Sequence, residues 1–398
     1  MSDLAARLRD RIHREGPIPF DAYVAAALYD QDSGFFARGG GAGRAGRDFL
    51  TSPETGECFG ACIARALDTW WRVLGEPDPY LVVEIGAGRG VLARSVLRAN
   101  PQCTTALRYV LVERSAHLRE AQRQLLSLED PELVLGPGMR DDLDEDHSVM
   151  SVPRSGPLVT AVDTIPALHA RGVVLANELL DNLPFRIATT RDGVWNEIRV
   201  GFDARAGFIE MPTPLDWSSV DAAFHALPDP QSVPDGARLP VLTALRPLWS
   251  ELHACLRSGI VACIDYAEST KTLLDRGDAW LRTFRAHCQG TGPLETPGAQ
   301  DITIDVPLEA WNSAVEAHGW RSAGAPRQAE WLRALGIETL ADAAAEYWRA
   351  NASVGDLAAI AARSRVHEAA ALTDPTGLGA YRVLLAHTPD VSFSGIGA

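Results

Sequence analysis

Short apolar runs alternate with stretches of helical spacing between residues 80 and 182. The runs are rich in Val, Leu and Ile, as expected for strands that are buried on both faces of a parallel sheet. We predict strands at 81–85, 109–113, 133–135 and 172–177, and helices at 90–99 and 116–126. The run at 133–135 is the weakest. This alternation is typical of βαβ units, so we expect an α/β fold with a mostly parallel sheet.

The parts that flank this region predict further elements. Leu4, Leu8 and Ile12 have helical spacing before a break at Gly16-Pro17. Asp192-Gly193 lies between alternating segments, which indicates an antiparallel hairpin over 185–211. The remaining predicted elements are helices at 21–28, 56–74, 241–256, 307–318 and 358–371, and a fifth strand at 259–266.

These elements suggest four consecutive segments. They are an N-terminal helical segment with a lid at 1–76, a Rossmann-like core at 77–202, an insertion with a helix at 203–258, and the rest of the core with a C-terminal helical region at 259–398. The glycine-rich stretch 38–47 is either a surface loop or a mobile lid that carries Arg44 and Arg47 over a site.

The composition restricts the possible partners. The chain has 398 residues, of which 46% are hydrophobic and 22% charged, as in ordinary globular proteins. It has 37 basic and 52 acidic residues, a formal net charge of −15. Because this charge repels phosphate backbones, we expect no nucleic-acid partner and favour basic or neutral substrates.

The cysteines and the N-terminus indicate the setting of the protein. The six cysteines form no Cys-x-x-Cys pair and no zinc-like cluster with histidine, so we expect reduced thiols and no metal. Residues 1–15 mix charged and apolar side chains, unlike a signal peptide. No run is long enough to span a bilayer. We therefore expect a cytoplasmic protein without a membrane partner.

The first predicted strand ends in an acidic residue followed by a glycine turn, Glu84-Ile85-Gly86-Ala87-Gly88-Arg89-Gly90. Glycines here let a strand turn sharply into a helix and let a ligand approach the backbone. The dinucleotide fingerprint needs glycine at position 91, where this chain has Val91. The turn therefore favours S-adenosylmethionine (SAM) over a nicotinamide or flavin cofactor.

SAM carries an amino-acid tail and a ribose. Glu84 is positioned to accept from its ammonium group, and the backbone amides of 86–90 to meet its carboxylate. Glu113 ends the second strand, where a carboxylate can accept from both ribose hydroxyls, and Arg114 adjoins it. The alternative is an ordinary glycine turn with surface carboxylates. We expect a class I methyltransferase fold, in which an antiparallel part and substrate-side elements accompany the Rossmann-like sheet.

Two further acidic segments follow predicted strands. Asp141 lies after the third strand, where such folds commonly bind the adenine amino group, although its charge run fits a solvated loop equally well. Asn177 ends the fourth strand and precedes Glu178 and Asp181. If a helical turn begins there, the two carboxylates share a face and can hold a cationic nitrogen. The alternative is a helix cap with a charged first turn.

The chain resembles the MidA-like methyltransferase family, which is related to a mitochondrial complex I assembly factor that methylates arginine. The resemblance rests on motifs that occur in order from about residue 16 to about residue 310: Gly16-Pro17-Ile18, Tyr23, Gly34-Phe35-Phe36, Asp48-Phe49-Leu50-Thr51-Ser52-Pro53-Glu54, Phe59-Gly60, the glycine turn, Asn177-Glu178-x-x-Asp181-x-x-Pro184, Ile264-Asp265-Tyr266 and Pro297-Gly298-x-x-Asp301-Ile302-Thr303.

This resemblance implies that Thr51, Ser52 and Pro53 line the cofactor pocket and that Asn177 lies near the transferred methyl group; Gly60 is a further candidate. The chain departs from the family at Ala267, where the family has glycine, and at 304–307, where the family has a histidine.

Three functions remain open from the sequence. The first is methylation of a protein or peptide side chain such as arginine, with Asn177, Glu178 and Asp181 as catalytic candidates. The second is methylation of a small-molecule or peptide carboxylate, for which Arg44, Arg47, Arg186 and Arg285 are candidate partners. The third is a SAM-binding assembly factor without catalysis. A homodimer is possible in each case.

Overall fold

The computed structural model describes residues 3–38, 51–136, 155–285 and 288–393. The chain forms two compact units, each built from three separate segments of the sequence. The first unit comprises 1–50, 180–249 and 266–317, and the second comprises 51–179, 250–265 and 318–398. The units interleave along the chain, whereas the sequence suggests four consecutive segments.

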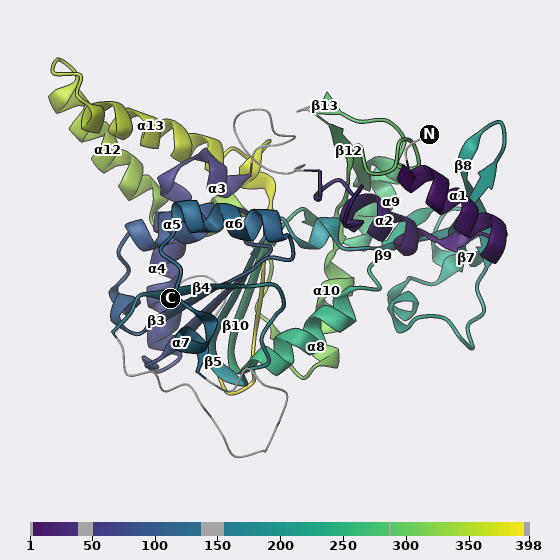
Figure 1. Ribbon diagram of the computed structural model, residues 1–398, viewed down its shortest axis with the longest axis horizontal. Coiled ribbons are helices and arrows are strands. Elements are labelled where there is room, and N and C mark those ends of the chain that lie inside the picture. Colours follow the sequence, from purple (N-terminus) through teal and green to yellow (C-terminus); the bar gives the residue numbers. More distant parts are fainter. Residues whose placement is uncertain (1–2, 39–50, 137–154, 286–287, 394–398) are drawn as a thin grey trace. The chain divides into compact units, whose positions relative to one another are not determined.

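A seven-stranded sheet is the centre of the second unit (Figure 1). Its strands, in spatial order, are β16 (Arg321–Ser322), β17 (Arg382–His387), β10 (Leu256–Asp265), β5 (Ala170–Asn177), β2 (Tyr80–Ile85), β3 (Leu107–Val112) and β4 (Leu158–Val162). The five strands from β10 to β4 are parallel, and β17 runs antiparallel to both of its neighbours. This mixed sheet confirms the predicted α/β class.

Helices accompany this sheet in the second unit. Their bounds are α3 (Ser52–Thr55), α4 (Glu57–Val73), α5 (Val91–Arg98), α6 (Ala116–Leu125), α7 (Pro131–Leu135), the C-terminal part of α8 (Leu245–Cys255), α11 (Gln328–Ala334), α12 (Ile337–Asn351) and α13 (Leu357–Leu372), with 3-10 helices η1 (Gln102–Thr105) and η7 (Leu378–Ala380). α12 and α13 pack on α4 and on each other. Figure 1 shows α12 and α13 side by side as an antiparallel pair.

The third strand is misassigned by the sequence pattern. Residues 133–135 belong to the short helix α7, and the strand beside β3 is β4. The Asp130 side chain accepts a hydrogen bond from the Glu132 amide at 2.9 Å, and Pro131 occupies the first turn. Capping and the preset φ of proline outweigh the strand propensity of a short apolar run.

Within the described residues, the first unit contains three sheets and several helices. Its helices are α1 (Asp3–Glu15), α2 (Phe20–Tyr29), the N-terminal part of α8, α9 (Thr270–Arg276) and α10 (Leu308–Ala317), with η3 (Leu180–Asn182), η4 (Ala222–Ala226), η5 (Pro230–Ser232) and η6 (Gly277–Trp280). Its strands are β1 (Ile18–Pro19), β6 (Arg186–Arg191), β7 (Val194–Asp203), β8 (Gly207–Pro214), β9 (Arg238–Val241), β11 (Ala267–Glu268), β12 (Leu281–Arg285), β13 (Cys288–Gln289), β14 (Asp301–Ile304) and β15 (Val306–Pro307).

The predicted hairpin in the first unit is confirmed. β6 and β7 pair antiparallel around Asp192 and Gly193, whose φ angles are 52° and 71°. Two successive residues with positive φ form the turn whose twist matches that of the flanking strands. The hairpin belongs to the sheet of the first unit, whereas the sequence places it in the Rossmann-like core.

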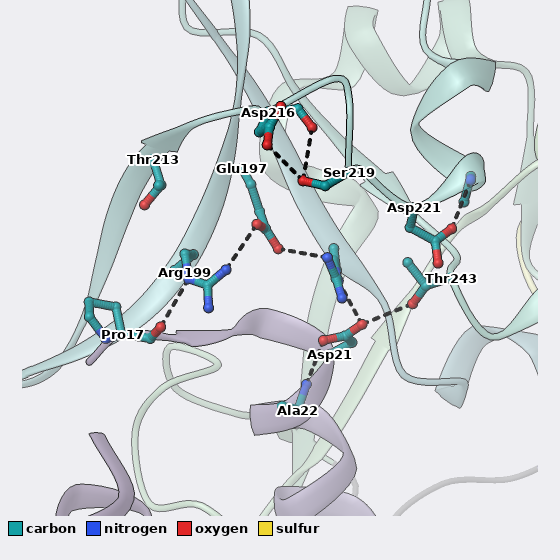
Figure 2. Close-up of polar contacts among 12 residues, drawn as sticks. Pro17, Asp21, Ala22, Glu197, Arg199, Thr213, Asp216, Ser219, Asp221 and Thr243 are labelled. Atoms are coloured by element: carbon teal, nitrogen blue, oxygen red, sulfur yellow. Dashed lines mark hydrogen bonds and ion pairs between the residues drawn. The ribbon is translucent and has the colours of Figure 1, made fainter. Parts of the chain in front are cut away.

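A network of charged side chains joins the N-terminal segment to this hairpin sheet (Figure 2). Asp21 accepts hydrogen bonds from Arg186 Nε at 2.8 Å and from Thr243 Oγ1 at 3.0 Å. Glu197 forms ion pairs with Arg186 and Arg199, both at 3.3 Å. The network compensates the burial of Glu197, which is 7% exposed.

The described part of the chain shows neither a membrane-spanning helix nor a cluster of metal ligands. Within the described residues, no helix is long and apolar enough to cross a membrane. The same part of the chain contains no group of three or more His, Cys, Asp or Glu side chains placed to hold a metal ion. All six cysteines are free thiols, and five of them are buried.

We expect Gly60→Ala to destabilise the second unit by about 2 kcal/mol, because a Cβ at position 60 would lie 2.2 Å from Ser95 Oγ and 2.7 Å from the Ser95 backbone carbon. Urea unfolding would show a lower midpoint without a change in slope. The double variant Gly60→Ala with Ser95→Gly should recover part of the loss. Equal losses with and without Ser95→Gly would contradict close packing of α4 on α5.

Candidate active site

The glycine turn between β2 and α5 has a backbone that side chains would disturb. Gly86, Gly88 and Gly90 have φ angles of 67°, 52° and 80°, in the left-handed region that favours glycine. A Cβ at Gly90 would lie 2.9 Å from Leu126 Cδ1, whereas one at Gly88 would meet no atom of the described residues within 4 Å. Gly90 is therefore required for packing, whereas the described residues leave the Cβ side of Gly88 uncovered.

Four amides of this turn donate to acceptors within the chain. The Gly86 and Ala87 amides donate to Val112 O at 2.9 and 3.2 Å, and the Gly90 amide donates to Ala87 O at 2.8 Å. The Gly88 amide donates to Glu113 Oε2 at 3.0 Å. A cofactor carboxylate could bind these amides only by sharing them, so the structure lends less support to that role than the sequence suggests.

Glu84 is buried below the turn, with 5% of its surface exposed. Its Oε2 accepts a hydrogen bond from Tyr109 Oη at 2.7 Å, and its carboxylate also accepts from the Ala93 amide. Ala93 is the third residue of α5, and the N-cap Gly90 has no side chain to bond that amide. Glu84 thus caps α5 from the strand. Burial raises the pKa of Glu84 to about 7.

Glu113 follows β3 and closes the other side of the turn. Its carboxylate oxygens accept from the Gly88 amide at 3.0 Å and from the Ser115 amide at 2.8 Å, and the carboxylate also accepts from the Arg114 amide. A carboxylate has about four acceptor positions, so some acceptor capacity remains for a ligand hydroxyl. Burial raises the pKa of Glu113 as well. Its neighbour Arg114 is exposed, and its carbonyl accepts from Arg119 at 2.9 Å.

The acidic residue after the third strand is Asp163. It follows Val162 of β4, which lies in register with Val112 of β3, and the Glu113 amide donates to Val162 O at 3.0 Å. Asp163 is exposed beside Glu113 at the same edge of the sheet. Asp141 follows the run at 133–135, which forms helix α7, and it lies outside the described residues, so its predicted role stays a prediction. The short β-branched run 158–162 before Asp163 is the signal that identifies this position.

The N-terminal candidates are all well packed. Ser52 is fully buried and donates to Gln328 Oε1 at 3.0 Å, Thr51 precedes it at the N-cap of α3, and Pro53 occupies the first turn of α3. Gly60 lies close to Ser95 of α5, where a Cβ at position 60 would be 2.2 Å from Ser95 Oγ, and its cofactor contact stays a prediction. Arg44 and Arg47 lie outside the described residues, as does all of the predicted lid except Arg38.

Two polar residues stand at the carboxyl end of the central strand β5. Asn177 Nδ2 donates to Glu178 Oε1 at 3.0 Å, while Asn177 Oδ1 is buried without a hydrogen-bond partner among the described residues. Glu178 has a φ of 52°, and its amide donates to Ile264 O at 2.8 Å. A non-glycine residue in this conformation is uncommon and requires surrounding contacts to hold it.

Asp181 is placed differently from Glu178. It lies in η3 of the first unit, 4% exposed, and accepts a hydrogen bond from Thr303 of β14. Partial burial opposes the charge of the half-buried Arg282 guanidinium, but its pKa is raised overall, chiefly by Asp305 and to a smaller extent by Tyr266 and Asp181. Because η3 begins only at Leu180, Glu178 and Asp181 do not share a helical face, which corrects the sequence prediction.

Asp265, which entered the sequence analysis only through the family resemblance, bonds the backbone that follows Asn177. Asp265 ends β10, is fully buried and accepts from the Leu179 amide at 3.0 Å through Oδ2. Together with the Glu178 amide bound to Ile264 O, this contact fixes the backbone that follows Asn177. The end of β10 therefore supports the conformation of the candidate residues on β5.

The edge of the sheet can hold a ligand that carries both hydroxyl and charged groups. In the sheet, Ile85 of β2 lies beside Val112 of β3 and Ala176 of β5, and Val112 lies beside Val162 of β4. The residues that follow these strand ends therefore gather at one edge of the sheet. Among the described residues, the Cβ side of Gly88 is uncovered and Asn177 Oδ1 has no hydrogen-bond partner. Together with the remaining acceptor capacity of Glu113, these features fit the ribose and the charged groups of SAM.

The strand order and this edge define a class I methyltransferase. Residues 62–325, well over half of the chain, match the model of the family described as "Putative S-adenosyl-L-methionine-dependent methyltransferase". The chain belongs to this family, and S-adenosyl-L-methionine is its cofactor.

Related proteins agree with this assignment. The chain is 29% identical over 343 residues to the Drosophila melanogaster protein arginine methyltransferase NDUFAF7 homolog, mitochondrial, covering 79% of this chain and 70% of the relative. It is 24% identical over 351 residues to the human protein arginine methyltransferase NDUFAF7, mitochondrial, covering 85% of this chain and 74% of the relative. A crystal structure of a Burkholderia thailandensis protein bound to S-adenosyl-homocysteine has a TM-score of 0.78 and 25% identity, covering 99% of this chain and 94% of that one.

We expect Glu84→Gln to change how stability depends on pH. The folded pKa of about 7 lies above the ordinary value of 4.5, so the folded state binds more protons than the unfolded state between these values. The stability of the wild type relative to Glu84→Gln should therefore fall by about 3 kcal/mol as pH rises from 4.5 to above 7. Urea titrations of both proteins across this range measure the difference, with the exposed-site variant Glu132→Gln as a control. A constant difference would contradict an uncompensated buried carboxyl group.

Glu113→Ala should weaken the binding of S-adenosyl-homocysteine by roughly 2–4 kcal/mol, because it removes two hydrogen bonds of about 1.5–3 kcal/mol each with partial compensation by water. Isothermal titration calorimetry gives the loss. Glu113→Gln retains one acceptor oxygen and should lose less. Wild-type affinity of the alanine variant would exclude Glu113 from the ribose site, provided that thermal unfolding shows the turn to be intact.

Proposed function

We propose that this chain transfers a methyl group from SAM to the guanidinium of an arginine side chain in a protein, with Asn177 and Glu178 as the catalytic residues. The observation that supports this proposal is the buried Asn177 Oδ1 without a partner among the described residues, next to the Glu178 carboxylate at the end of β5. A buried acceptor without a donor costs stability unless a ligand supplies one.

The chemistry of the acceptor matches these two groups. A guanidinium has five N–H donors, has no acceptor and stays protonated at ordinary pH. Asn177 Oδ1 and the Glu178 carboxylate can each accept one of these donors and orient the planar group. Bound SAM supplies an electrophilic methyl group on a positively charged sulfur.

Methyl transfer also requires handling of one proton. The acceptor nitrogen forms its bond to the methyl carbon as the carbon–sulfur bond breaks, and sulfur keeps that electron pair and becomes neutral. The nitrogen must align with the carbon–sulfur bond and lose one proton. In this proposal, Glu178 holds the nitrogen in line and accepts that proton.

The names of the relatives support an arginine acceptor. The Drosophila and human relatives are both named protein arginine methyltransferases, and each aligns over more than two thirds of its length with this chain. Asp181 remains a second candidate for the acceptor site, since its carboxylate is buried beside Thr303. We also propose Thr51, Ser52, Pro53, Glu113 and Asp163 as residues of the cofactor site.

Methylation of a carboxylate has weaker support. An anionic acceptor requires a nearby cation, and Arg186 is engaged by Asp21 and Glu197 within its own unit. Arg285 is exposed at the end of β12. Labelled SAM, candidate acceptors and mass spectrometry of the methylated atom separate the two possibilities.

The setting of the protein remains a prediction. The composition favours a cytoplasmic protein without a nucleic-acid partner, whereas the names of the relatives place those proteins in mitochondria. The possible homodimer is likewise a prediction. Localisation of the protein in its own cells would determine its compartment. Sedimentation of the purified chain would determine whether it forms a homodimer.

We expect Glu178→Gln to lower turnover on an arginine acceptor by roughly 10²–10⁴, the usual range for a positioned acid or base. The amide retains the shape of the side chain and removes its charge, so affinity for SAM should change little. Steady-state transfer of labelled methyl groups measures turnover, and calorimetry measures affinity.

Asp181→Asn is the matched comparison for this variant. If Asp181 also binds the acceptor, its amide variant should show a comparable loss of turnover. If Asp181 only anchors Thr303, the loss should be small, because an amide oxygen can still accept that hydrogen bond. Near-wild-type turnover of both variants would end the proposal that carboxylates on this segment hold arginine.

A further inference from the structure

Buried polar groups connect the end of β5 to the segment around α3 through the C-terminal part of the second unit. The connection uses Tyr381, which precedes β17, and Gln328, the first residue of α11. Both residues lie beyond the region that the family model matches, which ends at 325. Both are also buried, with exposures of 3% and 0%.

The Tyr381 hydroxyl contacts Glu178 directly. Tyr381 Oη donates to Glu178 Oε2 at 3.3 Å, while Asn177 Nδ2 donates to Oε1 at 3.0 Å. The tyrosine contact is long for a hydroxyl and a carboxylate, for which about 2.7 Å is usual. Donors thus contact both oxygens of the Glu178 carboxylate, and both contacts bear on the direction in which it points.

The backbone of Tyr381 is itself fixed by α11. The Gln328 amide donates to Tyr381 O at 2.7 Å, and the Val383 amide donates to Pro326 O at 2.9 Å. The Gln328 side chain accepts from Ser52 Oγ at 3.0 Å and donates to Leu372 O at 3.2 Å. Gln328 thus links the segment that begins α3 to Tyr381, the residue before β17.

We propose that Tyr381 is a positioning residue for methyl transfer, which orients the Glu178 carboxylate and is held in place by Gln328. This inference rests on the proposed role of Glu178. The C-terminal segment 326–383 is then part of the active site, although it lies outside the region matched by the family model. Orientation matters because a displacement of about 1 Å at a reacting group can reduce the rate about 10²-fold.

Tyr381→Phe tests the proposal because it removes only the hydroxyl and keeps the buried ring. We expect turnover on the methyl acceptor to fall about 10- to 100-fold, with the KM for SAM changed by less than about twofold. Tyr80→Phe is the matched control. Tyr80 is fully buried in β2 of the same sheet and donates to Leu67 O at 3.1 Å, away from Glu178. This control should retain wild-type turnover, and wild-type turnover of Tyr381→Phe would overturn the proposal.

A double-variant comparison separates positioning from a purely structural role. In a Glu178→Ala background, Tyr381 has no carboxylate to orient, so Tyr381→Phe should cause no further loss of turnover. A further loss equal to that in the wild-type background would show that Tyr381 acts independently of Glu178, which contradicts the proposal.

A measurement without any acceptor distinguishes failure of this inference from failure of the proposed function. Crystal structures of the wild type and of Tyr381→Phe, both with S-adenosyl-homocysteine, show the direction of the Glu178 carboxylate. We expect it to turn or to occupy two conformations in the variant, and an unchanged carboxylate overturns the inference. Absence of arginine methylation by the wild type, in contrast, contradicts only the proposed acceptor.

Discussion

The buried carboxylate of Glu84 is the interaction on which the cofactor edge depends. A glycine turn leaves α5 without a side-chain cap, and Glu84 replaces that cap by accepting from the Ala93 amide. The same carboxylate accepts from Tyr109 and so joins β2 to β3. Burial opposes the charge of this group and raises its pKa to about 7. Burial makes the Glu84 carboxylate unfavourable, but this carboxylate fixes the glycine turn, whose backbone must remain uncovered.

Glu113 serves the same turn from the neighbouring strand. It accepts from the Gly88 and Ser115 amides and keeps some acceptor capacity. Since parallel strands end at one edge, Glu113, Asp163 and Asn177 gather there although they are far apart in sequence. The chemistry of the site therefore follows from strand register, and the loops after the strands supply the specific groups.

Sequence patterns predicted the helices and strands that have strong periodicity. They failed where a helix cap or pairing with a distant strand decides which element forms. The strands β2, β3, β5 and β10 and the hairpin at Asp192-Gly193 were predicted because hydrophobic runs and turn residues are local signals. The run at 133–135 was misassigned because Asp130 and Pro131 cap a helix there. The strand at 382–387 was not predicted, since its antiparallel insertion between β10 and β16 depends on the completed sheet.

The sequence by itself determined the class of protein, the glycine turn, Glu113 and the polar end of β5, because each follows from a strand and the residues next to it. Only the tertiary structure decided how candidate side chains are used. Gly60 packs on Ser95, Asp181 bonds Thr303, Ser52 bonds Gln328 276 positions away, and Glu178 meets Tyr381 203 positions away. Hydrogen bonds and close packing require partners at defined distances, and local patterns carry no information on which distant residue supplies that partner.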